Sequence, residues 1–159
     1  IMSSKRIFID FDGVIFDTEN RVIEMKQQNS NMSWDIFFES LDWFQLLEEA
    51  KVINNAIDYI LEGQKKSMQI AILTKIHSLI EMEAKTKALR NRNVKVPILF
   101  VPPHTKKSEI YFPNNGEILI DDSVKNLKDW AQKGGESIYF SETLNSSEFQ
   151  TIKTLKRVL

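Results

Sequence analysis

Cysteine is absent from the 159-residue sequence, and histidine occurs only twice. The first absence excludes disulfide bonds, thiolate nucleophiles and cysteine-ligated zinc, and the scarcity of histidine argues against a histidine-rich metal site. A metal ion in this protein is therefore expected to have oxygen ligands.

The sequence also lacks an apolar run of about 20 residues, the length needed to span a bilayer. The early segment SSKRIFIDFDG carries acids within its apolar part, unlike a secretory signal peptide. The net charge is −1, and there is no long basic run that would bind duplex nucleic acid. We expect a cytoplasmic protein with neither a membrane nor duplex nucleic acid as a partner.

Hydrophobic residues make up 42% and charged residues 27% of the chain, which is typical of a globular domain. The length is that of one domain, so we expect residues 1–159 to form a single core domain. Monomer and homodimer are both left open.

Five short apolar runs alternate with longer segments of helical periodicity. Runs that are apolar almost throughout are typical of strands covered on both faces. Strands are expected at 5–11, 68–74, 97–101, 116–121 and 136–140, and helices at 76–92, 123–133 and 145–158. The alternation predicts an α/β fold, a Rossmann-like parallel sheet of about five strands with helices on both faces.

The interval between the first two expected strands is longer than a parallel crossover requires. A crossover needs about a dozen residues, whereas no strand is expected between Thr18 and Lys66. Residues 19–48 contain surplus helical segments rich in aromatic residues. We expect them to form a small helical cap inserted after the first strand.

Polar side chains close three of the expected strands. The first strand ends at Asp10 with Asp12 just beyond, the second ends at Thr74, and the fourth ends at Asp121 and Asp122. Ligands of open parallel sheets bind outside the carboxyl ends of the strands. One such aspartate alone is more often a turn residue or a helix cap. Several together repel one another unless a cation lies between them, and oxygen ligands suit Mg²⁺.

Four segments in this order, DFDGV, AILT, a lysine and ILIDD, resemble the four motifs of the haloacid dehalogenase-like (HAD) hydrolases. The resemblance covers about 5–12 and 68–140. The aromatic cap and the LIDD ending are also similar to the 5′(3′)-deoxyribonucleotidases and related small phosphatases. The resemblance implies a phosphatase that requires Mg²⁺, because the second acid of the first motif is present.

The resemblance also implies roles for the acids. Asp10 would be the nucleophile that forms an aspartyl-phosphate, and Asp12 the general acid and base that also offers its backbone carbonyl to the metal. Gly13 would let the chain turn so that Asp12 lies over the phosphate. The implied Mg²⁺ ligands are Asp10, Asp12, Asp121 and Asp122.

The remaining motif residues would bind the phosphate group. The Thr74 hydroxyl would donate to one phosphate oxygen, and a lysine would neutralise another. Lys107 is preferred to Lys106, because KSEIY resembles the start of the family's helix. Lys75 could add positive charge or face solvent. Backbone N–H groups in the turn at Phe11 could complete an anion site.

The aromatic side chains of the cap have two possible roles. Trp34 and Phe38 either pack the cap onto the core or stack on a nucleobase. His77 is expected to pack near a helix start rather than touch a leaving group. The mixed charges at 81–92 are expected to form a solvated helix face.

The sequence thus predicts a Mg²⁺-dependent phosphomonoesterase acting on a small phosphorylated metabolite, with a (deoxy)nucleoside monophosphate among the candidates. A polynucleotide-end or sugar phosphatase of the same fold is one alternative, and a non-catalytic HAD-like binding protein is another. A two-component receiver domain also gathers acids, threonine and lysine, but in a different order along the chain.

Overall fold

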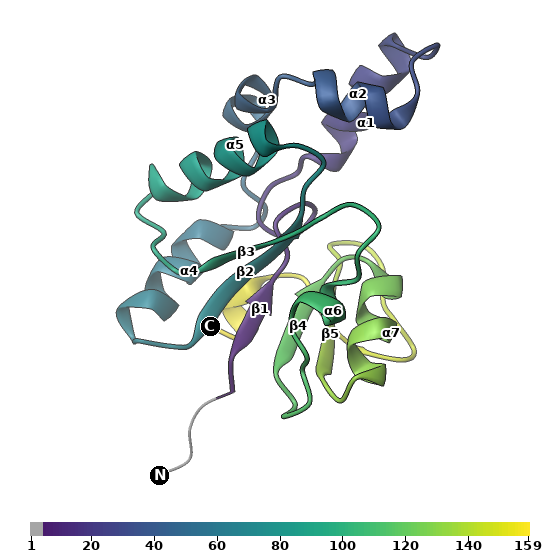
Figure 1. Ribbon diagram of the computed structural model, residues 1–159. Coiled ribbons are helices and arrows are strands. Elements are labelled where there is room, and N and C mark those ends of the chain that lie inside the picture. Colours follow the sequence, from purple (N-terminus) through teal and green to yellow (C-terminus); the bar gives the residue numbers. More distant parts are fainter. Residues whose placement is uncertain (1–4) are drawn as a thin grey trace.

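The computed structural model describes residues 5–159, and its centre is a parallel six-stranded sheet in the order β3-β2-β1-β4-β5-β6 (Figure 1). The strands are β1 (Ile7–Ile9), β2 (Ile70–Lys75), β3 (Ile98–Val101), β4 (Ile118–Asp121), β5 (Glu136–Phe140) and β6 (Gln150–Ile152). The expected fold class is confirmed, with six strands in place of about five.

The central strand β1 is buried on both faces because its side chains alternate between two apolar clusters. Ile7 and Ile9 belong to the cluster on one face, and Phe8 belongs to the cluster on the other. Ile9 is in register with Ile72 of β2 and Ile120 of β4. The residues that follow these three positions therefore reach the same edge of the sheet.

Helices cover both faces. Helices α4 (Ala56–Lys65) and α5 (Leu79–Arg90) contribute to the cluster with Ile9, whereas α7 (Val124–Gln132) contributes to the cluster with Phe8. The short helix α6 (Lys107–Ile110) packs beside α7. In the second cluster the Trp130 indole N–H donates to the Glu117 carbonyl over 2.9 Å, which satisfies the polar atom of the largest buried side chain.

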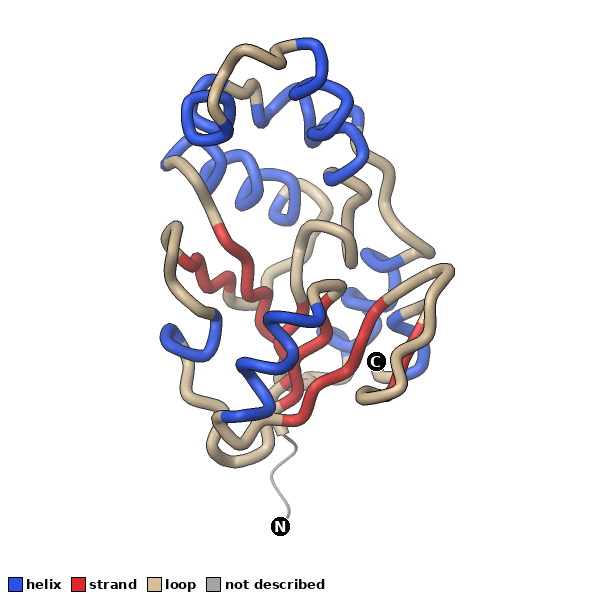
Figure 2. The backbone as a smooth tube through the Cα atoms, turned by 90° about the vertical axis from the view of Figure 1, so that its right-hand side faces the viewer, coloured by secondary structure: helices blue, strands red, loops and turns tan. Residues whose placement is uncertain are grey.

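Three further helices lie between β1 and α4, namely α1 (Glu19–Gln28), α2 (Trp34–Ser40) and α3 (Trp43–Glu49). Figures 1 and 2 show them grouped at the end of the molecule toward which the strands run. The Ser33 and Asp42 side chains cap the starts of α2 and α3. Trp43, Leu46 and Leu47 bury the inner face of α3 in the core, and α3 packs against α5.

The cap boundaries at 19–48 and the single-domain interpretation of 1–159 stay predictions, and residues 1–4 lie outside the described residues. Within residues 5–159, no helix combines the length and the apolar character that a membrane crossing needs.

The helix expected at 145–158 is wrong. The segment forms the edge strand β6, followed by a 3₁₀ turn at Leu155–Arg157. Pairing of β6 with β5 satisfies backbone groups that a helix would satisfy internally, and it directs Ile152 into the core beside Leu155. The β-branched pair Thr151–Ile152 suits a strand at this position.

Candidate active site

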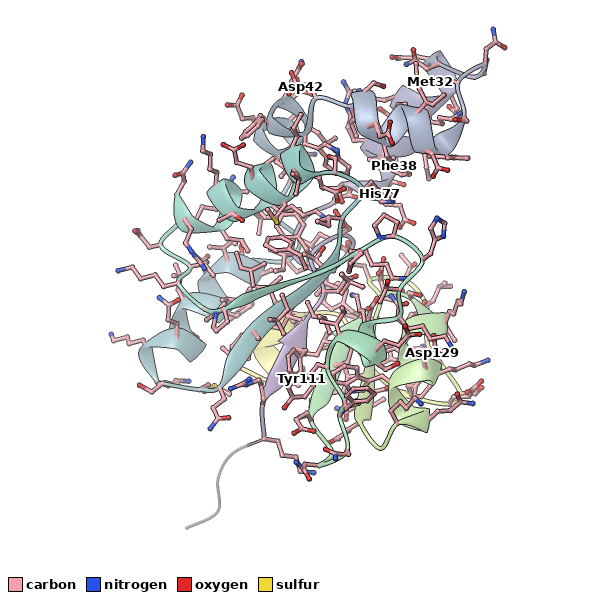
Figure 3. The ribbon with its side chains drawn as sticks, in the orientation of Figure 1. Met32, Phe38, Asp42, His77, Tyr111 and Asp129 are labelled. Atoms are coloured by element: carbon pink, nitrogen blue, oxygen red, sulfur yellow. The ribbon has the colours of Figure 1, made fainter. Side chains whose placement is uncertain are left out.

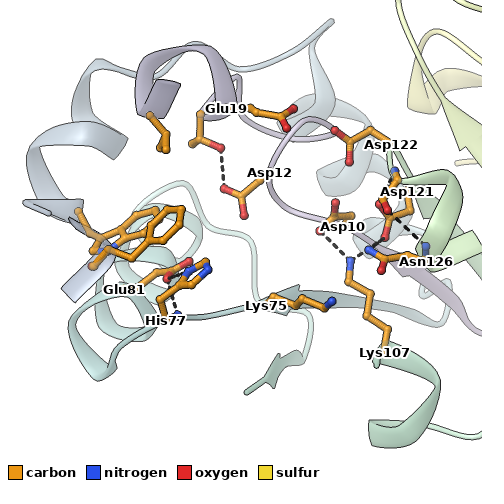
Figure 4. Close-up of a pocket in the computed structure, with 15 residues that line it drawn as sticks. Asp10, Asp12, Glu19, Lys75, His77, Glu81, Lys107, Asp121, Asp122 and Asn126 are labelled. Atoms are coloured by element: carbon orange, nitrogen blue, oxygen red, sulfur yellow. Dashed lines mark hydrogen bonds and ion pairs between the residues drawn. The ribbon is translucent and has the colours of Figure 1, made fainter. Parts of the chain in front are cut away.

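Three carboxylates converge at the carboxyl edge of the sheet. Asp10 directly follows β1, Asp121 ends β4, and Asp122 is the next residue along the chain. One carboxylate oxygen from each lies within 4.8 Å of the others. Together with Asp12 they line a cavity of about 210 Å³ beneath the cap (Figure 4). The structure therefore brings together the four aspartates singled out in the sequence.

Gly13 allows the chain to turn directly after the first two aspartates. Its φ of 78° is in the left-handed region, and a Cβ atom there would overlap the Asp122 carboxylate. The turn is closed by the Gly13 N–H, which donates to the Phe16 carbonyl over 2.9 Å. Glycine is therefore favoured here, because any other residue would strain the backbone and displace the Asp122 carboxylate.

Lys107 neutralises part of the charge of the cluster. It begins α6, its side chain is almost fully buried, and its Nζ lies 2.8 Å from Asp10 Oδ1 and 2.7 Å from Asp121 Oδ2. Lys106 has a side chain that is 54% exposed and pairs with Asp129 at 3.8 Å. Of the two lysines, the structure therefore brings Lys107 to the site.

The pKa values of the cluster reflect burial and the repulsion of like charges. Burial and Asp121 raise the pKa of Asp10 well above its ordinary value, although Lys107 opposes this rise. Burial and Asp121 also raise the pKa of Asp122, to about 7. Burial alone would raise the pKa of Asp121, but Lys107 and the Ser123 N–H outweigh it, so this pKa is lowered.

The cluster fits a divalent cation. Three carboxylate oxygens close together form a hard, anionic donor set without nitrogen or sulfur, the set that Mg²⁺ prefers. Burial and the neighbouring carboxylates raise the pKa values of two of these aspartates, so their charged forms are disfavoured when no cation is bound. A bound cation would offset this effect.

The phosphate-binding residues expected from the sequence differ in their placement. Thr74 lies near the carboxyl end of β2 but is fully buried. Its hydroxyl accepts a hydrogen bond from Lys85 over 2.9 Å. Lys75 lines the cavity. The Phe11 N–H, expected to face an anion, donates to Asp10 Oδ1 over 2.8 Å and so orients that carboxylate.

The solvated face expected at 81–92 is wrong at two positions. Glu81 is 1% exposed and Lys85 is fully buried, and the two side chains form an ion pair of 2.7 Å. Lys85 also reaches Asp12 Oδ2, at 2.7 Å. The signal was present in the sequence, because 81 and 85 share the spacing of the buried positions Ala84, Ala88 and Leu89.

Aromatic rings form the cap side of the cavity. Phe38 of α2 lines it, and its ring stacks on His77 with centroids 3.9 Å apart (Figure 3). The His77 ring is held by Glu81, whose Oε1 lies 2.9 Å from Nδ1. Trp34 stacks on Phe38 at 5.5 Å but is itself 49% exposed and does not line this cavity.

No protein-family model matches this sequence, and no curated protein matches it either. The fold, by contrast, has many counterparts among solved structures.

A HAD hydrolase of family IA, variant 3, from Entamoeba histolytica superposes with a TM-score of 0.67 and 13% identity, covering 98% of this chain and 96% of its own. A hydrolase from Pseudomonas syringae also has a TM-score of 0.67 and 13% identity, over 98% of this chain and 100% of its own. The D,D-heptose 1,7-bisphosphate phosphatase from B. bronchiseptica, complexed with magnesium and phosphate, has a TM-score of 0.60 and 15% identity, over 96% and 94%. This chain therefore has the fold of HAD-superfamily hydrolases.

Asp122→Asn should stabilise the metal-free protein at pH 8. With a pKa of about 7, folded Asp122 keeps a proton that the unfolded chain loses near pH 4, so stability falls as pH rises from about 4 to about 7. Removing this penalty should raise the free energy of unfolding by on the order of 2 kcal/mol, allowing for partial exposure. That corresponds to a melting temperature higher by about 4–8 °C.

The measurement is thermal unfolding in EDTA at pH 8 and pH 4. At pH 4 the variant and the wild type should melt together, because folded Asp122 is then protonated. Glu62→Gln on the exposed face of α4, away from the start of the helix, is the control and should change little at either pH. A variant that melts at or below the wild-type temperature at pH 8 contradicts the assignment.

Proposed function

We propose that this protein is a Mg²⁺-dependent phosphomonoesterase that hydrolyses a small phosphorylated metabolite through an aspartyl-phosphate on Asp10. The observation that carries this proposal is the convergence of three carboxylates, with the buried Lys107 ammonium bridging two of them. The fold shared with HAD-superfamily hydrolases, among them a phosphatase complexed with magnesium and phosphate, supports it.

In the first step, an Asp10 carboxylate oxygen attacks the phosphorus atom. A P–O bond to Asp10 forms while the P–O bond to the leaving group breaks, and Asp12 gives its proton to the leaving oxygen. Lys107 lies against Asp10, where it offsets the repulsion between the incoming phosphate and the carboxylates.

In the second step, Asp12 accepts a proton from a water molecule as the water oxygen attacks phosphorus. The bond to Asp10 breaks, which releases inorganic phosphate and restores both aspartates. Asp10, Asp121 and Asp122, with the backbone carbonyl of Asp12, would hold Mg²⁺, which supplies Lewis-acid stabilisation of the phosphoryl oxygens when bound.

The aromatic side of the cavity favours a substrate with a planar or apolar group attached to the phosphate. Phe38 and Trp43 line the cavity within reach of the aspartates, and Val22 adds an aliphatic surface. A (deoxy)nucleoside monophosphate fits this arrangement, because a base could take the place of His77 against the Phe38 ring. A cytoplasmic location agrees with such a substrate.

Asp10→Asn should abolish phosphate release while the fold is retained, because the amide is a poor nucleophile with nearly the shape of aspartate. The assay is Mg²⁺-dependent release of inorganic phosphate from a panel of nucleoside monophosphates and sugar phosphates. EDTA should abolish wild-type turnover, and added Mg²⁺ should restore it. Full turnover by the variant, or wild-type silence across the panel with Mg²⁺, would refute the proposed chemistry.

Phe38→Leu should raise KM for nucleoside monophosphates by about tenfold, given the ~1–3 kcal/mol measured for a base stacked on an aromatic ring. KM for a sugar phosphate should change much less, since leucine retains the apolar bulk. Phe44→Leu is the matched control, because Phe44 lies in a separate groove beside Lys87 of α5. Equal KM changes for the two substrate classes would argue against a base at Phe38.

A further inference from the structure

Lys85 is a fully buried cation that the chemistry proposed above does not use. Helix α5 brings its Nζ to four oxygen atoms on three parts of the chain. It lies 2.7 Å from Asp12 Oδ2, 2.9 Å from Thr74 Oγ1, 3.0 Å from the Lys75 carbonyl and 2.7 Å from Glu81 Oε2. One ammonium group thus joins the turn after β1, the end of β2 and α5 itself.

The Asp12 carboxylate is held at both oxygens. Oδ2 accepts from Lys85, and Oδ1 accepts from the hydroxyl of Thr18, itself only 1% exposed, over 2.6 Å. The Asp12 side chain nevertheless remains 35% exposed and faces the cavity (Figure 4). A carboxylate open to substrate is therefore fixed in one orientation by two groups that are closed to solvent.

The two oxygens of the Asp12 carboxylate differ, because Lys85 and Thr18 have different hydrogen-bonding capacities. An ammonium group only donates, so Lys85 keeps Oδ2 as an acceptor, whereas the Thr18 hydroxyl can donate or accept. Oδ1 is therefore the oxygen that can exchange a proton with a leaving group.

The cost of burying Lys85 also points to a role beyond packing. A lysine at the centre of an apolar helix face must lose its hydration, and an aliphatic residue would fill the space without that cost. Here burial lowers the pKa of Lys85, but Asp12 and Glu81 more than offset this effect, so the side chain stays charged. Asp12 contributes most to this offset, and Glu81 adds to it.

We propose that Lys85 is a positioning residue for Asp12, which it orients for proton transfer to the leaving oxygen, with Glu81 as its charge partner. The proposal rests on the phosphomonoesterase function given above. It assigns no contact between Lys85 and the phosphate, because the Nζ protons are already directed at protein oxygens.

The test compares two substrates of similar shape that differ in their need for an acid. p-Nitrophenyl phosphate releases an acidic phenol that departs without protonation, whereas phenyl phosphate releases a phenol with a pKa of about 10. The ratio kcat/KM is measured for both, because it reports the steps up to the first P–O cleavage and so isolates the acid step.

Lys85→Met should lower kcat/KM for phenyl phosphate about tenfold more than for p-nitrophenyl phosphate, a part of the ~10²–10⁴-fold that acid catalysis supplies. Asp12→Asn should show the same selectivity to a larger degree. Lys85→Arg keeps the charge and the donors, and should recover part of the lost phenyl phosphate activity.

Lys85→Met alone leaves Glu81 unpaired and could fail to fold, so Glu81→Gln/Lys85→Met, which removes both charges, is measured beside it. The double variant should melt near the wild-type temperature and show the same selective loss. Equal losses on the two substrates in a folded variant would overturn the positioning role, and would indicate that Lys85 acts on the phosphate or on the fold. Wild-type silence on both substrates would instead refute the phosphomonoesterase function itself.

Discussion

Repulsion among carboxylates at one edge of the sheet is the constraint on which the rest of this structure depends. Within residues 5–159, six carboxylates line the cavity there, and two buried ammonium groups, those of Lys85 and Lys107, contact them. The carboxylates belong to Asp10, Asp12, Glu19, Glu81, Asp121 and Asp122. Burial and repulsion raise the pKa values of Asp10 and Asp122, so the ionised forms of these two groups are disfavoured in the absence of a cation. A divalent cation bound there would favour the ionised forms.

The fold delivers the two cations from opposite faces of the sheet. Lys107 comes from α6, which packs beside α7 on the face that contains Phe8, whereas Lys85 comes from α5 on the face that contains Ile9 (Figure 1). The two lysines therefore reach the aspartates at the strand ends from different sides, and each contacts different aspartates. Lys107 contacts Asp10, the proposed nucleophile, and Asp121, a proposed metal ligand, whereas Lys85 contacts Asp12, the proposed proton donor.

The sheet and the row of aspartates could be predicted from the sequence because both depend on local patterns. Uninterrupted apolar runs indicate buried parallel strands, and a polar residue directly after such a run marks the carboxyl edge. The edge strand β6 could not be predicted in this way. It has three residues, only Ile152 of which is buried, and its strand conformation depends on pairing with β5. Helical spacing in the surrounding sequence was therefore misleading.

Glu81 and Lys85 were misinterpreted for a different reason. A glutamate four residues before a lysine is the usual pattern of an exposed helix face, where such pairs add little stability. Their burial depends on the tertiary position of Asp12, 73 residues from Lys85 in the chain. Propensity and charge pattern carry no information about that contact. The spacing shared with Ala84 and Ala88 indicates that the pair is buried and needs polar partners, but not which residues these are.

The same pair also connects the cap to Asp12, the proposed proton donor. Phe38 of the cap stacks on His77, and both the ring and the backbone N–H of His77 form hydrogen bonds with Glu81 Oε1. Glu81 Oε2 forms an ion pair with Lys85, which also pairs with Asp12. Each of the three middle residues, His77, Glu81 and Lys85, contacts both the residue before it and the residue after it in this series. A substrate that takes the place of His77 against Phe38, as proposed above, would therefore disturb Glu81, which contributes to balancing the charge of Lys85. In the proposed reaction, recognition of the leaving group and placement of its proton donor thus share one turn at the start of α5.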